Sequence, residues 1–80
     1  MEIRTKFKPK DKIWAIETIN GRYFIAGIFI VTDIKQDKNL GIIYKAYRLQ
    51  RKWNFQFLEQ DCFATKEEAQ KECERRNGAN

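Results

Sequence analysis

The stretch KIWAIETINGRYFIAGIFIVTDI, residues 12–34, decides the fold because it contains a complete β-hairpin signal. Its first part is rich in β-branched and aromatic residues and runs directly into Asn20 and Gly21. This dipeptide is typical of a two-residue hairpin turn, since both positions accept a positive φ. The return segment, residues 22–34, is apolar on both sides, like a strand that is covered on both faces. The sequence therefore predicts two antiparallel strands joined by a tight turn.

Gly27 lies in the middle of the return segment. Glycine weakens the interior of a strand, so its presence there indicates a bulge, a sharp bend or the close approach of another backbone. In a small barrel, one long strand has to bend in order to serve two sheets. We therefore expect Gly27 to form the corner of such a barrel.

Three further segments, residues 3–8, 42–49 and 53–58, have the pattern of strands. The first ends at Pro9, which cannot donate to a ladder and therefore starts a turn. The last alternates cleanly, and its aromatic residues are expected to point inward: Trp53, Phe55 and Phe57.

The C-terminal segment FATKEEAQKECERRNG changes to a helical period. Thr65 is a good N-cap, and Glu68 stands at the third helical position, which completes a capping box. The apolar side of this helix is narrow and consists of Ala69 and Cys73. We expect such a helix to pack against a sheet or barrel edge, because it would not be stable alone.

Five strands and one terminal helix predict a single domain, residues 1–80, of the mainly β class. The expected architecture is a small five-stranded antiparallel SH3-like barrel with one C-terminal α-helix at about residues 65–77, because short hairpins join the strands. A five-stranded OB-like barrel is the alternative.

The segments DKIWAI, AGIFIV, YKAYRL and FATKEEAQKEC together resemble a group of short, mostly uncharacterised bacterial and phage proteins. These proteins are SH3-like barrels with a C-terminal helix. The first segment also resembles KOW and Tudor-type barrels, which often carry GDKV at the same turn, although Lys10 stands here in place of that glycine. The resemblance implies an architecture and an origin in a mobile element, and it supplies no functional residue. In such a setting, we expect a phage or prophage accessory protein.

The sequence contains neither serine nor histidine. This excludes Ser-His and Cys-His nucleophilic pairs and every histidine general base. No glycine-rich phosphate-binding loop occurs either. We therefore expect a protein that is not an enzyme, with no cofactor and no small-molecule substrate. Cys62 and Cys73 are too few ligands for a structural zinc site, and we interpret them as small buried apolar groups.

No apolar run approaches the ~18 residues that a membrane span requires, and no signal peptide is visible. Two cysteines without a secretion signal are typical of a reducing compartment. We therefore expect a cytoplasmic protein that does not bind membranes.

The formal net charge of +5 comes from two segments. In the first, every second residue is basic: Arg4, Lys6, Lys8, Lys10 and Lys12. An extended chain points these side chains the same way. We interpret the row as the solvated face of an edge strand, where lysines discourage association between edges. A phosphate-binding track is the alternative.

The second segment interleaves cations with aromatic residues, and its candidate contact residues are Tyr44, Lys45, Arg48, Arg51 and Lys52. Alternation favours Ile43 and Tyr47 as core residues, which leaves Tyr44 exposed beside Arg48. Cations that neutralise phosphates, next to exposed aromatic rings that stack on bases, are the combination found in single-strand binders.

The sequence therefore predicts a small non-catalytic binding module. The favoured partner is another protein, and an acidic surface would complement this basic chain. The alternative is a single-stranded nucleic acid held on a basic, tyrosine-containing sheet face. The sequence leaves open the oligomeric state and whether the two basic segments form one face.

Overall fold

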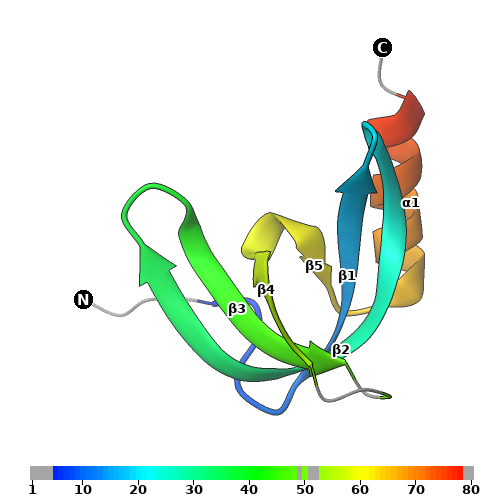
Figure 1. The fold of residues 1–80 in the computed structure, drawn as a ribbon. Helices are drawn as coiled ribbons and strands as arrows, with labels where there is room; N and C mark the ends of the chain where they lie inside the picture. The colour runs from blue at the N-terminus through cyan, green and yellow to red at the C-terminus, as the bar shows by residue number, and fades with distance from the viewer. Residues whose placement is uncertain (1–4, 49, 51–52, 79–80) are drawn as a thin grey trace.

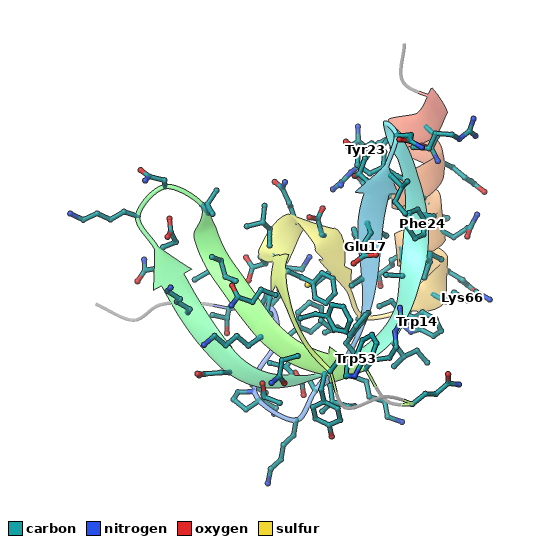
Figure 2. The ribbon with its side chains drawn as sticks, in the orientation of Figure 1. Trp14, Glu17, Tyr23, Phe24, Trp53 and Lys66 are labelled. Atoms are coloured by element: carbon teal, nitrogen blue, oxygen red, sulfur yellow. The ribbon has the colours of Figure 1, made fainter. Side chains whose placement is uncertain are left out.

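The computed structural model describes residues 5–48, 50 and 53–78. Within them the chain forms one antiparallel sheet with the strand order β4-β3-β2-β1-β5, followed by one α-helix (Figure 1). The mainly β class with a C-terminal helix is confirmed. The elements are β1 Lys12–Ile19, β2 Arg22–Asp37, β3 Gly41–Arg48, β4 Asn54–Leu58, the 3-10 helix η1 Glu59–Asp61, β5 Cys62–Phe63 and α1 Lys66–Gly78.

The predicted β1–β2 hairpin is confirmed. Ile19 pairs with Arg22 across a two-residue turn, and both turn residues have positive φ, 51° at Asn20 and 79° at Gly21. These values fit the turn type whose twist matches that of the flanking strands.

β2 carries the bulge that Gly27 predicted. Ala15 pairs with Gly27, whereas the next residue of β1, Ile16, pairs with Ile25, so Ala26 is the extra residue. The φ of Gly27 is +136°, a value that residues with a side chain rarely adopt. A second irregularity follows, because Val31 pairs with Ala46 and Asp33 with Lys45, which makes Thr32 another extra residue. Bulges increase twist and bend a strand.

The sheet bends strongly but does not close. β4 and β5 lie at opposite ends of the strand order, and no pairing joins them in the described residues. The predicted closed barrel is therefore not observed. Figure 1 shows β2 running beside α1, bending, and continuing into the hairpin with β3 on the opposite side of the molecule.

The strand predicted at residues 3–8 is wrong where the structure describes it, since residues 5–8 do not belong to a strand. The fifth strand is β5 instead, in which Phe63 pairs with Trp14 and Cys62 with Ala15 of β1. The turn that Pro9 predicted is present, and the backbone N–H of Asp11 donates to the carbonyl of Lys8 (3.1 Å).

The segment before this turn is held by side chains rather than by a ladder. The backbone N–H of Lys6 donates to the Glu59 carboxylate (3.0 Å), and that of Phe7 donates to the Tyr44 hydroxyl (3.1 Å). Phe7 itself is buried, with its ring edge-to-face on Tyr44. A strand ladder is not needed here, because these donors are already satisfied.

The concave face of the sheet holds the larger core, in which Phe29 packs edge-to-face with Phe55 and Phe57. The inward direction predicted for the two β4 phenylalanines is confirmed. The same prediction is wrong for Trp53, which is 63% exposed. Trp53 precedes β4, which begins at Asn54, so the alternation of the strand does not fix its direction.

α1 covers part of the opposite, convex face. Its two buried residues, Ala69 and Cys73, pack against Ile16 of β1, as the narrow apolar side predicted. The N-cap is confirmed, because the Thr65 hydroxyl oxygen accepts a bond from the backbone N–H of Glu68 (3.2 Å).

Arg76 fastens the far end of α1 to the rest of the molecule. Its guanidinium donates to Asp61 (2.8 Å), to Glu72 (2.6 Å) and to the Gln60 carbonyl (3.0 Å), and it lies over the Tyr23 ring. The helix is thereby tied to η1 and to β2 at once.

Candidate interaction surface

The structure separates the candidate contact residues of the two basic segments. Three of them, Arg4, Arg51 and Lys52, lie outside the described residues. The other candidate contact residues do not form one row.

The first basic segment turns at Pro9, so its lysines do not share one strand face. Lys6 lies before the turn, where its ammonium donates to the Cys62 carbonyl (3.2 Å) and sits over the Phe63 ring (5.4 Å). Lys8, Lys10 and Lys12 are exposed. The interpretation of this segment as the solvated face of an edge strand is therefore wrong for the described residues.

The prediction that Tyr44 is exposed is also wrong. Tyr44 is fully buried, and its hydroxyl donates to the Glu59 carboxylate (2.6 Å) while it accepts from Phe7 N–H. Burial and the neighbouring carboxylate raise the pKa of Tyr44 to about 12. A tyrosine fits the core here because its hydroxyl finds partners inside. This tyrosine is therefore not available for stacking on a base.

Two rows of side chains cross the convex face beyond α1. Residues paired across adjacent strands project on the same side of a sheet, so the register defines the rows. Together we name them the outer strip; the first row is Lys12, Ile30, Tyr47 and Asn54, and the second is Asp33, Lys45 and Gln56.

In the described residues, the outer strip extends the convex face beyond the area that packs against α1. Trp14 is two residues from Lys12 on β1 and therefore projects on the same side. Trp14 packs with the α1 cluster, whereas Lys12 is exposed. Ile30 and Tyr47 are partly exposed. The strip thus combines apolar and aromatic area with the ammonium groups of Lys12 and Lys45.

The register also shows which residues of the two basic segments lie on the same face of the sheet. Lys12, from the first segment, and Lys45, from the second, lie on the same face on either side of β2. Arg48 lies on the concave face, where its guanidinium stands over Phe29. The two segments therefore share one face only in part.

A cavity of about 420 Å³ adjoins the outer strip at the second bulge of β2. The Thr32 hydroxyl donates to the Lys45 carbonyl there (3.1 Å), which fixes the extra residue against β3. The cavity is lined by Thr32, Asp33, Lys45, Asn54, Phe55 and Gln56.

A second pocket of about 250 Å³ lies at the end of β3, beside the bulge at Gly27. It is lined by Ala26, Gly27, Ile28, Arg48 and Gln50. Among the described residues, Arg48 is the one predicted contact residue that lines this pocket, and it brings a guanidinium to a strand edge.

The two cysteines are buried and unbridged, as predicted. Burial raises the pKa of the Cys62 thiol to about 12, and the nearby Asp61 carboxylate adds to this shift. A thiol with such a pKa is protonated at neutral pH and is a poor nucleophile. Over the described residues, no group of three or more cysteine and acidic side chains is arranged to hold a metal ion.

In the part of the chain that the structure describes, no helix has the length and apolar character needed to cross a membrane.

Sequence reasoning missed Ile30, Tyr47 and Asn54 as surface neighbours. Their common signal is the pairing register, which depends on the two bulges of β2. Alternation alone assigned Tyr47 to the core and Tyr44 to the surface, and one wrong choice of side reversed both. The clean alternation of β4 does identify the polar face of Asn54 and Gln56.

A comparison of the chain with protein families, with curated proteins and with solved structures finds no match.

Proposed function

We propose that this protein is a small non-catalytic binding module that docks on an acidic surface of another protein through the outer strip. The observation that carries this proposal is that α1 covers only part of the convex face. Beyond it lies a partly apolar, lysine-bearing area whose side chains are partly or fully exposed in the described part of the chain.

The composition of the strip supports docking on a protein. Interfaces commonly have an aromatic or aliphatic centre and a polar, charged rim. Here the partly exposed Ile30 and Tyr47 are paired neighbours at the centre, and Lys12 and Asn54 flank them. This arrangement offers an apolar anchor surrounded by groups that interact with water or with a charged partner.

The charge of the strip supports an acidic partner. Lys12 and Lys45 lie on it, and Asp33 is its one carboxylate. The first basic segment is also bonded to β2, because the backbone N–H of Lys10 donates to the Val31 carbonyl (2.7 Å). Complementary charge accelerates association and selects against basic partners.

A single-stranded nucleic acid is the second candidate, and the position of Tyr47 favours it. Tyr47 is partly exposed on the face that carries Lys12 and Lys45, so a base stacked on its ring would have cations nearby for the phosphates. The burial of Tyr44 removes the aromatic residue on which this function was expected to depend.

Fluorescence anisotropy titrations distinguish the two functions. The probes are a labelled decaglutamate peptide, single-stranded RNA, single-stranded DNA and duplex DNA, each at two salt concentrations. We expect the acidic peptide to bind more tightly than any nucleic acid. Tighter binding of RNA or DNA, weakened about 20- to 40-fold by a fourfold rise in salt, would assign the module to nucleic acid instead, with about three phosphates neutralised.

We also propose that this protein is a bacterial or phage accessory protein with an SH3-like architecture. The strongly bent, open sheet with its terminal helix is compatible with that architecture. Small barrels of this kind recognise partners through loops, edges and sheet faces.

A further inference from the structure

We propose that the pocket beside the Gly27 bulge binds a carboxylate group, presented by an acidic side chain of the partner protein, through the guanidinium of Arg48. This inference deepens the docking function proposed above and rests on it. The pocket lies at the end of β3, where Arg48 comes from the concave face and Ile28 in the lining is two residues from Ile30 of the outer strip on β2.

The guanidinium of Arg48 is held in place before any ligand arrives. One of its N–H groups donates to the Ala26 carbonyl (2.6 Å), and the group lies over the rings of Phe29 and Phe55, at 5.5 and 5.8 Å from their centroids. Cation–π contacts of this kind orient the planar group. A fixed fork loses little conformational freedom when it binds a carboxylate.

Within the described residues, most donors of the Arg48 guanidinium have no hydrogen-bond partner. A guanidinium has five N–H donors, and a single bond, to the Ala26 carbonyl, engages one of them in the described part of the chain. No carboxylate of the described residues pairs with Arg48. Arg75 and Arg76, by contrast, both pair with Glu72. Arg48 thus differs from these two arginines, whose guanidinium groups are paired with a carboxylate.

The glycine at the bulge keeps one edge of this guanidinium accessible. A Cβ atom at position 27 would lie 3.9 Å from Nη2 and 4.0 Å from Nε of Arg48. These two nitrogens form one of the edges with which arginine binds a carboxylate in the bidentate mode. Residue 27 has no side chain, so no Cβ atom lies against this edge; one hydrogen of Nη2 already donates to the Ala26 carbonyl, which leaves Nε–H and the second Nη2 hydrogen for a ligand.

The lining favours a carboxylate over a phosphate. Among the described residues of the lining, Arg48 is the one cation, and Gln50 adds a neutral carboxamide. One guanidinium matches the single charge and two oxygens of a carboxylate. A phosphate monoester carries more charge and three acceptor oxygens, which a single arginine leaves partly uncompensated.

The test is a ¹H–¹⁵N NMR titration of the full chain with sodium acetate, with sodium chloride at equal ionic strength as the control. We expect saturable shifts of the Arg48 Nε–H and Gly27 N–H signals with acetate and none with chloride. The variant Arg48→Lys, checked for an unchanged fold by its remaining amide signals, should bind acetate about tenfold more weakly or worse. The titration of the unmodified protein is decisive even if that variant fails to fold.

Two results overturn the carboxylate pocket: a response to acetate that does not saturate, or tighter binding of inorganic phosphate than of acetate at the same signals. A parallel titration with decaglutamate separates this failure from that of the docking function. If the peptide shifts the outer strip but not Arg48 and Gly27, the pocket is wrong and the docking function stands. If acetate binds at Arg48 and the peptide does not bind the strip, the docking function is wrong and the pocket stands.

Discussion

Gly27 and Gly41 have different backbone conformations, although both have positive φ, +136° and +84°. The second value lies near the left-handed region that a residue with a side chain reaches at a moderate cost, whereas the first lies well outside it. We therefore predict that Gly27→Ala lowers the free energy of unfolding by about 2 kcal/mol and Gly41→Ala by about 1 kcal/mol. Urea denaturation of the two variants measures the difference. The reverse order would contradict the assignment of Gly27 to a strained bulge.

Thr65 makes a local contribution at the start of α1, where its hydroxyl accepts from the backbone N–H of Glu68. Replacement by alanine leaves that donor without its cap, so Thr65→Ala should destabilise the protein by about 1 kcal/mol. Thr65→Ser, which keeps the hydroxyl, is the matched control. An unchanged midpoint of thermal unfolding in Thr65→Ala would argue against this cap.

At the residue scale, the sequence predicted what depends on local chemistry. The cap at Thr65, the turn at Asn20 and Gly21, and the bulge at Gly27 each follow from a backbone requirement that few residues meet. The burial of Tyr44 does not, because it depends on Glu59 and Phe7, which are distant in sequence. Nothing near position 44 reports those partners.

At the scale of the elements, Tyr44 attaches residues 5–8 to the sheet. The hydroxyl joins Phe7 N–H and the Glu59 carboxylate, so Tyr44→Phe leaves a buried donor and a carboxylate without this partner. We predict a loss of about 2 kcal/mol at neutral pH. Chemical denaturation at pH 7 measures it, and a loss below the error of the method would contradict the tether.

The same hydroxyl gives a pH dependence with a defined sign. The pKa of Tyr44 is raised to about 12 in the folded protein, whereas a tyrosine in the unfolded chain titrates near 10. Between these values the unfolded state has lost the proton that the folded state keeps, so the free energy of unfolding falls as pH rises from 10 towards 12. The difference in stability between the unmodified protein and Tyr44→Phe should therefore shrink over this range. A constant difference would mean that folding does not raise the pKa of Tyr44.

Arg76 attaches α1 to η1 in a similar way. It bonds to Asp61, Glu72 and the Gln60 carbonyl, whereas the neighbouring Arg75 is exposed and pairs within the helix with Glu72. Arg76→Lys loses the fork geometry and should cost about 1–2 kcal/mol, while Arg75→Lys should cost less than about 0.5 kcal/mol. Thermal unfolding of both variants compares them. Equal losses would show that the link between α1 and η1 is not important for stability.

The strands and the helix were predictable where the sequence pattern agrees with the contacts observed in the structure. β1, β2, β3, β4 and α1 all lie within a few residues of the predicted segments. The exceptions are residues 5–8, whose alternation is that of a strand although their backbone donors bond to side chains, and β5, which is too short to have a periodic pattern. Tertiary contacts decide both cases.

At the scale of the whole molecule, docking requires that part of the convex face is accessible to a partner. α1 occupies the area around Ile16, and the outer strip extends the same face over β2, β3 and β4. The composition of the chain predicted a binding module with two basic segments. It did not predict that Lys12 and Lys45 share one face of the sheet, because this depends on the register of three strands.

The most direct test of docking through the outer strip is the binding of decaglutamate to two charge-reversed variants of equal net charge. One is Lys12→Glu with Lys45→Glu on the strip, and the other is Lys66→Glu with Lys71→Glu on α1, where both lysines are exposed. Equal net charge removes the long-range contribution of the whole molecule from the comparison. We predict that the strip variant binds decaglutamate at least about tenfold more weakly than the unmodified protein does. The α1 variant should lose less than about half as much binding free energy as the strip variant. Equal weakening by both variants, or stronger weakening by the α1 variant, would contradict docking through the strip.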